Sequence, residues 1–395
     1  MDSLEGGKGD GGGAFEVLTR DFVLLFASGL LFMGSLYIII PVLPLYMLDV
    51  VKMSRTQVGI VIGLLTVSSM LARPFIGRWS DRWGRKPLMV FGSLNFVAAS
   101  LLYIAARNLV SLLFVVLFQG VGMACFHTAA LTFVGDIAPA ARRGQSMAWY
   151  HTSFNFGIML GPLIGAYLRV ASGYPSVFVA ASVAAALSFV FLLFVSESKA
   201  EEIEGVLDAP RAVSHLKLVI YACVAAFAGT VVLGAVETFV PVYAQVKHIP
   251  HYALFFTVMA GTLIAFRLLA GSVPDVFGRR MAITLSVATL GASVIILAFT
   301  GSLWMLCIVA FIYGAGFAYH TPAISALLAD KVPASELGGA FGLFLAAFEG
   351  GIATGAIVMG PASTALGFKA SFIIIGIFSL SCAVFLGASY KRFTR

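Results

Sequence analysis

Two acidic residues, Glu237 and Glu349, lie deep inside long apolar stretches of the sequence, and no other residue among the 18 Asp and Glu does. A charged carboxylate in an apolar environment is costly, so each is expected to face the interior of the protein. Burial there favours the neutral form, which allows a carboxylate to take up and release a proton. The two residues therefore predict a proton relay. The alternative is a purely structural, protonated Glu that is hydrogen-bonded to a neighbouring helix.

Other polar side chains recur in the same apolar stretches. His151 lies one helical turn before Asn155, on the same face of a helix. Because imidazole titrates near neutral pH, His151 is a candidate second proton site, although a hydrogen-bonded neutral histidine is an alternative. The remaining candidates for a polar and aromatic cavity lining are Gln119, His127, Tyr150, Tyr313 and His320, together with Asn155. Ordinary packing and hydrogen bonds between helices explain these residues equally well.

The apolar stretches are long enough to cross a membrane. Hydrophobic residues make up 60% of the 395 positions and charged residues 11%, against roughly one quarter charged in soluble domains. A spanning helix needs about 20 apolar residues. Twelve spans are predicted near 22–48, 56–78, 86–106, 110–134, 145–168, 176–196, 217–244, 251–272, 281–300, 303–328, 338–360 and 370–390. The predicted fold class is an all-α integral membrane protein.

The basic residues are divided unequally between the two sides of the predicted membrane. Only a few fall on one side, namely Lys52, Arg55, Arg107, Arg169, Lys247 and Lys369. This asymmetry places both termini in the cytoplasm of a multi-pass cell-membrane protein, and it accounts for the net charge of +7 without a nucleic-acid partner. Residues 1–20 are glycine-rich and polar and are expected to form a disordered cytoplasmic tail, and residues 391–395 a short C-terminal one.

The sequence repeats itself at one constant offset, the separation of Asp81 and Asp275. At this offset the segment Arg73–Lys86 superposes on Arg267–Arg280, and Asn155 superposes on Glu349. The repeat predicts two pseudo-symmetric six-helix bundles, 21–196 and 216–390, joined by a polar cytoplasmic linker, 197–215, whose acidic residues could alternatively bind a partner. Two such bundles can rock about a central site, which is typical of a transporter.

A short charged loop follows the second predicted helix of each half. In the first half its key residues are Gly77, Asp81, Arg82, Gly84, Arg85 and Lys86. The glycines allow close approach and a tight turn, and Asp81 is placed to pair with Arg85 or to cap a helix N-terminus. This pattern closely resembles the signature loop of the major facilitator superfamily, and the whole chain fits the six-plus-six plan of that family.

The resemblance implies a conformational latch. In that family Asp81 and Arg85 would join the two bundles on the cytoplasmic side when the cavity faces outward, with Asp275 and Arg279 as weaker counterparts. The second copy of the loop has Val276 where the first has Arg82, which favours the first as the working latch. Alternatively, the basic residues only follow the positive-inside rule.

A second motif lies in the fifth predicted helix. Its residues are Gly157, Gly161, Pro162 and Gly165. Small residues four apart let helices pack closely, and a proline kinks its helix. The pattern resembles the G-x-x-x-G-P-x-x-G sequence of proton-coupled exporters, although it could be a general packing seam. The fourth helix departs from that branch, because Val116 stands where many exporters have a membrane arginine.

The resemblance implies a non-enzymatic, 12-helix drug:proton antiporter that functions as a monomer and needs no metal or other cofactor. The proton gradient would drive export of small amphipathic or cationic molecules by alternating access. A siderophore or lipid exporter, proton-coupled uptake of a sugar or organic acid, and a non-transporting membrane sensor are the alternatives. Arg73 and Arg267, one turn before their loops, are expected to reach the cytoplasmic interface and not to bind a ligand.

Overall fold

The computed structural model describes residues 19–139, 142–197, 215–269 and 278–394. Residues 1–18 of the predicted tail 1–20, and residues 198–214 of the predicted linker 197–215, lie outside them. The described chain is largely helical. Its helices are α1 (Arg20–Ile39), α2 (Leu43–Asp49), α3 (Arg55–Trp83), α4 (Arg85–Ala105), α5 (Leu109–Ile137), α6 (Arg143–Ser172), α7 (Tyr174–Leu193), α8 (Leu216–Val246), α9 (Leu254–Leu269), α11 (Arg279–Leu297), α12 (Leu303–Lys331), α13 (Ala334–Ala365) and α14 (Gly367–Thr394).

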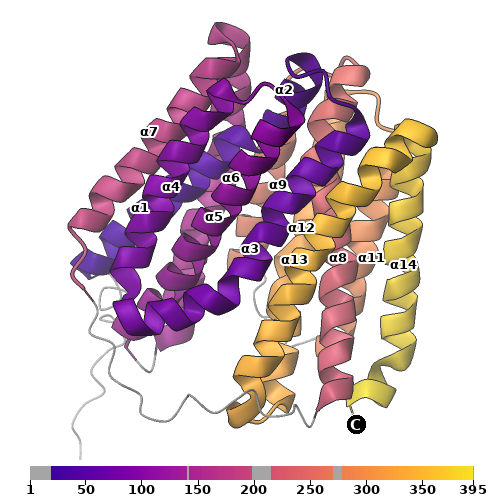
Figure 1. Cartoon of the computed structure of the whole chain (residues 1–395). Helices are drawn as coiled ribbons and strands as arrows, with labels where there is room; N and C mark the ends of the chain where they lie inside the picture. The colour runs from indigo at the N-terminus through magenta and orange to yellow at the C-terminus, as the bar shows by residue number, and fades with distance from the viewer. Residues whose placement is uncertain (1–18, 140–141, 198–214, 270–277, 395) are drawn as a thin grey trace, which may run out of the picture.

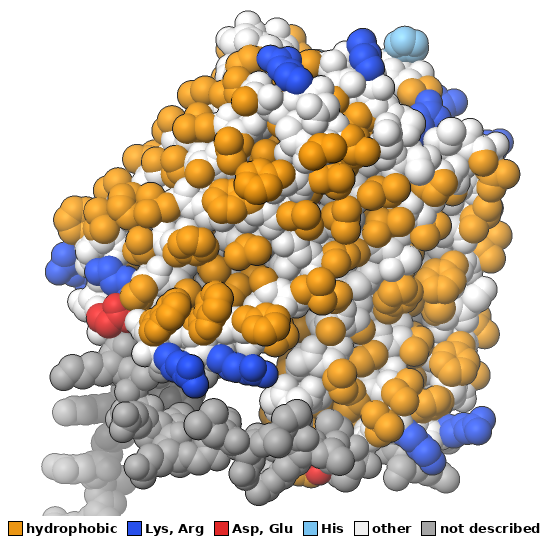
Figure 2. All heavy atoms as spheres, viewed as in Figure 1, with side chains coloured by type: hydrophobic (Ala, Val, Ile, Leu, Met, Phe, Trp, Pro, Cys, Tyr) orange, Lys and Arg blue, Asp and Glu red, His pale blue; other side chains and the backbone are white. Residues whose placement is uncertain are grey.

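Eleven spans in the described chain are long and apolar enough to cross a membrane. The first of them comprises α1 and α2, which are separated by a break at Pro41. The predicted span 251–272 corresponds to α9, whose described apolar part is shorter. Hydrophobic side chains cover the middle of the visible surface, and Lys and Arg side chains lie toward its two ends (Figure 2). The predicted all-α membrane fold is confirmed.

The helices run back and forth between two ends of the molecule. We call the end with Trp83, Leu193 and Leu216 the linker end, and the end with Asp49 and Val246 the opposite end. Helices α1–α7 form one half of the molecule and α8–α14 the other, and α3 lies beside α13 where the halves meet (Figure 1). Helices α6 and α9 also pack together across the halves, and α2 and α3 contact α8.

Each half has the same close helix pair. In the first half α6 packs on α1, and a methyl group added at Gly161 would come within 2.8 Å of the Tyr37 carbonyl carbon. In the second half α13 packs on α8, and a methyl group at Gly351 would come within 2.8 Å of the Phe227 carbonyl oxygen. The small residues of the motif in α6 therefore allow two backbones to touch.

Candidate functional site

An ion pair joins the two halves near the middle of the membrane-spanning region. A guanidinium nitrogen of Arg73 in α3 contacts Oε1 of Glu349 in α13. Glu349 is buried, and its second oxygen has no hydrogen-bond partner in the described part of the chain. At ~1.5 Å per residue, Glu349 lies about 23 Å from each end of its helix. The expectation that Arg73 reaches the interface is therefore wrong, because the buried carboxylate holds its charged group inside the protein.

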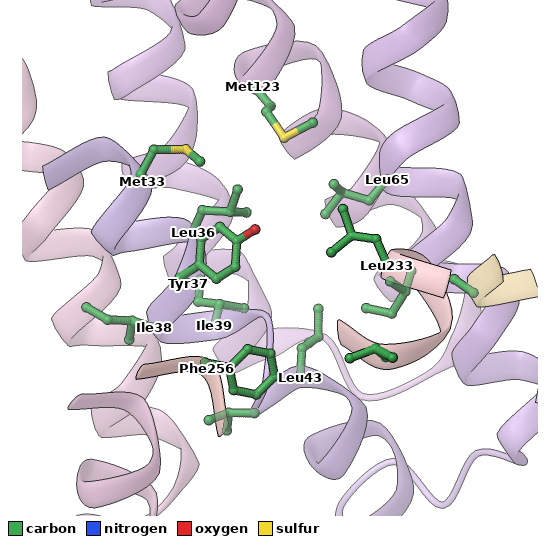
Figure 3. Packing of buried hydrophobic residues seen from close by; sticks show 14 of the residues in the cluster. Met33, Leu36, Tyr37, Ile38, Ile39, Leu43, Leu65, Met123, Leu233 and Phe256 are labelled. Atoms are coloured by element: carbon green, nitrogen blue, oxygen red, sulfur yellow. The ribbon is translucent and has the colours of Figure 1, made fainter. Parts of the chain in front are cut away.

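A second buried carboxylate also contacts the other half. The Tyr37 hydroxyl donates a hydrogen bond of 2.8 Å to Oε1 of Glu237, which belongs to α8. Figure 3 shows this hydroxyl pointing away from α1 toward Leu65 and Leu233. Tyr313 of α12 is fully buried and close enough to Glu237 for the two groups to interact electrostatically. Glu237 therefore lies among phenol groups from both halves.

A small cavity connects Glu237 to the first half of the protein. It has about 30 Å³ of space for water and is lined by Glu237, Gln119 and Thr66, among other residues. A cavity of this size holds one or two water molecules. Gln119 accepts a 2.6 Å hydrogen bond from Tyr103, while its buried amide nitrogen has no partner in the described chain. A water molecule bonded to that nitrogen would extend the polar path from Gln119 toward Glu237.

Two histidines contact Phe154. The His127 ring stacks on Phe154 at a centroid distance of 5.0 Å, and His151 meets the same ring edge-on at 5.8 Å. His127 contacts the Met33 sulfur at 3.1 Å. The positive charge of Arg73 interacts electrostatically with the His127 ring. Arg267 in turn acts on His151, whose side chain is exposed. The predicted proton-site residue His151 lies on α6, which packs on α9, the helix that carries Arg267 in the other half.

Arg267 is also held inside the protein. Its Nε donates a 3.4 Å hydrogen bond to the carbonyl of Ala318, at the middle of α12. The expectation that Arg267 reaches the interface is therefore wrong, as it is for Arg73. Val116, where many exporters have a membrane arginine, is fully buried.

The other predicted cavity residues lie in packed surroundings. Tyr150 and His320 are fully buried, and Asn155 is nearly so. His320 lies within the second half, where its Nδ1 is 3.3 Å from the Ser286 hydroxyl. The structure does not bring Tyr150 and His320 into polar contact with either carboxylate. Their assignment to the cavity stays a prediction.

In the described part of the chain, the ion pairs and hydrogen bonds seen for Arg85, Lys86 and Arg279 lie within their own halves. Gly84, with φ of 88°, forms the tight turn between α3 and α4, and Gly278 has a φ of 81° at the equivalent point. Arg85 pairs with Asp136 at 3.2 Å. Lys86 donates to the carbonyls of Leu193 and Val195. Asp275 and the side chain of Asp81 lie outside the described residues, and the role of the loop as a latch between halves stays a prediction.

Two residues that bind the buried carboxylates, Arg73 and Tyr37, are not indicated by the sequence motifs. Arg73 was interpreted from its distance to the loop, and Tyr37 was one of many aromatic residues in apolar stretches. The signal for Arg73 was available, because an arginine and a glutamate that both lie deep in spans are expected to pair. No sequence pattern singled out Tyr37.

Comparison with known proteins agrees with this architecture. The family model described as Major Facilitator Superfamily matches residues 25–273 and 251–392. "Multidrug resistance protein 2" of Bacillus subtilis (strain 168) is 26% identical over 329 residues, which cover 78% of this chain and 80% of that protein. "Multidrug resistance protein MdtG" of Enterobacter lignolyticus (strain SCF1) is 26% identical over 395 residues, which cover 95% of this chain and 92% of that protein.

Solved structures share the fold at low sequence identity. A crystal structure of a POT family transporter in complex with a thioalcohol-conjugated peptide superposes with a TM-score of 0.80 at 14% identity, covering 95% of this chain and 97% of that one. A crystal structure of a mutant of the nucleoside transporter NupG has a TM-score of 0.77 at 14% identity, with 94% and 100% covered. At this identity the likeness shows the fold alone.

Proposed function

Because the chain belongs to the major facilitator superfamily, we propose that it exports small amphipathic molecules by alternating access in exchange for protons. The names of the multidrug resistance relatives support export of drug-like compounds or metabolites. The positive-inside rule supports a cytoplasmic linker end. The single observation that carries the proposal is the ion pair of Arg73 and Glu349, which joins the two halves at mid-span.

Protonation of Glu349 is the proposed coupling step. A charged Glu349 attracts Arg73 and holds α3 against α13. A proton on Glu349 removes that attraction and weakens the link between the halves. Breaking a buried pair leaves an uncompensated charge, at a cost of about 3–5 kcal/mol in a fully buried site. The cost is smaller here because the Arg73 side chain is 22% exposed. Proton binding and the separation of the helices are thereby coupled.

Glu237 is the proposed second proton site, and it lies closer to the opposite end. Its hydrogen bond from Tyr37 crosses between the halves, as the ion pair does. The water-sized cavity beside it gives a proton a route toward Gln119. Protons entering from the opposite end would reach Glu237 first and Glu349 next, with His151 as the third titrating group near the linker end.

The polar contacts between described residues of the two halves support a cavity that opens to the linker end. Besides Tyr37 with Glu237, three such contacts lie toward the opposite end. They are Gln245 to Asp49 at 3.2 Å, Arg55 to the carbonyl of Ser363 at 3.1 Å, and Thr257 to the carbonyl of Met159 at 3.0 Å. Among the polar contacts between described residues of the two halves, the ion pair of Arg73 lies nearest the linker end. In the alternate state these contacts would separate, and Asp81 and Arg85 would close the linker end.

Amphipathic molecules fit this conformation better than small cations. Both buried carboxylates are already bonded, Glu349 to Arg73 and Glu237 to Tyr37. The cavity beside Glu237 is also too small for a substrate. Binding through aromatic surface, such as that of Phe154 and its two histidines, is therefore proposed instead.

Purified protein in proteoliposomes with an imposed pH gradient tests the proposal. Glu349→Gln should abolish gradient-driven transport of a fluorescent amphipathic probe, because the neutral amide cannot exchange a proton. Glu336→Gln is the matched control, since it is the same change on the same helix, near the linker end, where Glu336 contacts His215 at 3.8 Å. It should retain transport. Undiminished gradient-driven transport by Glu349→Gln would overturn the proposed coupling.

A further inference from the structure

Arg73 and Arg267 occupy equivalent positions in the two halves but differ in their partners. Arg73 is paired with the carboxylate of Glu349. Arg267 has no carboxylate within ion-pair distance among the described residues, and its Nε bonds to a backbone carbonyl, that of Ala318. An arginine inside a membrane-spanning helix is costly and is normally neutralised by a partner. The site around Arg267 therefore has an uncompensated positive charge.

The repeat identifies the residue that replaces the missing carboxylate. Glu349 corresponds to Asn155, and α6 packs on α9 as α13 packs on α3. By the repeat, Asn155 is the residue of α6 that corresponds to Glu349, and α9, on which α6 packs, is the helix that carries Arg267. Asn155 is neutral and can donate a hydrogen bond. His151 lies one turn away on the same helix. This residue is exposed, and it interacts electrostatically with Arg267.

We propose that Arg267, Asn155 and His151 bind a carboxylate of the transported molecule, so that the substrates include amphipathic organic acids. This inference rests on the proposed transport function and names its substrate class. The planar guanidinium of Arg267 matches a carboxylate with two parallel hydrogen bonds. The amide of Asn155 and the imidazole of His151 supply further donors. The carboxylate of the substrate thus takes the place that Glu349 has beside Arg73.

The surroundings of the site suit an aromatic body attached to that acid. His151 meets the Phe154 ring edge-on, and His127 stacks on the same ring. On the other half, Phe266 is next to Arg267 in sequence and contacts the Tyr319 ring at a centroid distance of 6.3 Å. Aromatic side chains are thus present on the helices of both halves that carry His151 and Arg267, which suits recognition of an amphipathic anion.

A pair of probes that differ only in charge tests the inference. We suggest 1-naphthaleneacetate and its neutral amide, with binding to the purified protein in detergent measured by calorimetry. The wild type should bind the acid at least about tenfold more tightly than the amide. Arg267→Gln should weaken acid binding about 10- to 100-fold, the loss expected for a hydrogen-bonded charge, with little effect on the amide.

Asn155→Asp is the more specific variant, because it keeps Arg267. An aspartate at this position supplies the internal carboxylate that the second arginine lacks, and it should abolish the preference for the acid. Arg107→Gln, which removes an exposed arginine from a loop at the opposite end, is the control for net charge and should keep the preference. Gel filtration of each variant confirms that the protein is folded.

The outcomes separate this inference from the proposed function. Equal binding of acid and amide by the wild type, or an undiminished preference in Arg267→Gln, overturns the carboxylate site. If anionic lipid abolishes acid binding by the wild type and has no effect on Arg267→Gln, the site binds a lipid headgroup. This outcome also overturns the carboxylate site. Binding in detergent needs no proton gradient, so a preserved preference without gradient-driven transport would contradict only the proposed coupling.

Discussion

Arg85 and Arg279 make the same contact in the two halves of the protein. Arg85, at the start of α4, pairs with Asp136 at 3.2 Å, and Arg279, at the start of α11, pairs with Asp330 at 3.1 Å. Each pair ties the beginning of one helix to the end of its neighbour at the linker end. The first pair is the more buried, with side-chain exposures of 9% and 29% against 25% and 49%.

This difference in burial predicts unequal effects of the same substitution. Asp136→Asn should lower the thermal stability of the purified protein more than Asp330→Asn does. The cost of Asp136→Asn is on the order of 1–3 kcal/mol, because the charge on an acceptor of a nearly buried guanidinium is lost. The cost of Asp330→Asn should be below about 1 kcal/mol, as for exposed pairs. Thermal unfolding in detergent measures both, and equal effects would contradict the ranking.

The ion pair between the halves predicts strong coupling between its two residues. Arg73→Gln and Glu349→Gln should each increase the labelling of a cysteine introduced at the opposite end, because each variant loses the same link. The double variant should resemble either single one. The coupling energy expected for a direct contact is about 0.5–3 kcal/mol. Additive effects would mean that the two residues act independently.

Because the hydrogen bond from Tyr37 crosses between the halves, its loss should affect transport, whereas the loss of a hydrogen bond within one half should not. Tyr37→Phe removes the bond to Glu237 between the halves. Tyr46→Phe is the matched control, because it removes a 2.8 Å bond to the carbonyl of Ala106 within the same half. Both should reduce thermal stability slightly, by about 1 kcal/mol. Only Tyr37→Phe should change the rate of gradient-driven transport. Similar transport rates in the two variants would remove Tyr37 from the proposed relay.

Much of the fold could be predicted from the sequence because membrane helices have a local signal. Each span must satisfy its own backbone hydrogen bonds and cover itself with apolar side chains, so length and composition locate it. The repeat further identified equivalent residues, and the contacts of Lys86 with Leu193 and of Arg280 with Gly387 follow that register. The break at Pro41 was not predicted, because a proline near a helix end is also compatible with an unbroken span.

The partners of the candidate site could not be predicted from local patterns. Glu237 and Glu349 were found because a carboxylate is rare in a span, but their partners depend on how two halves pack. Arg73 lies 276 positions before Glu349 along the chain, and Tyr37 lies 200 before Glu237. Periodicity gives the face of a helix and not the helix that covers it. The proximity of His151 to Arg267 was missed for the same reason.

Tyr252 lies between α8 and α9, outside the spans. Its side chain is 6% exposed, and its hydroxyl has no hydrogen-bond partner in the described chain. Burial raises the pKa of Tyr252 to about 12, against a smaller opposing effect of Arg169. The pKa in the unfolded chain is about 10. The folded state therefore retains the proton over a pH range in which the unfolded state releases it.

Below about pH 10 both states keep the proton of Tyr252, and the stability that depends on this proton is fully present. As the pH rises from about 10 to 12, the unfolded state releases the proton first, so the free energy of unfolding falls by an amount on the order of 2 kcal/mol. Tyr252→Phe removes the titrating group, so its unfolding temperature should fall less than that of the wild type over this range. At pH 8 the variant should be at least as stable, because a buried hydroxyl without a partner is removed. Tyr167→Phe, which alters a side chain that is 72% exposed, should follow the wild type. Parallel curves for the wild type and Tyr252→Phe would show that burial of this phenol does not contribute to the alkaline loss of stability.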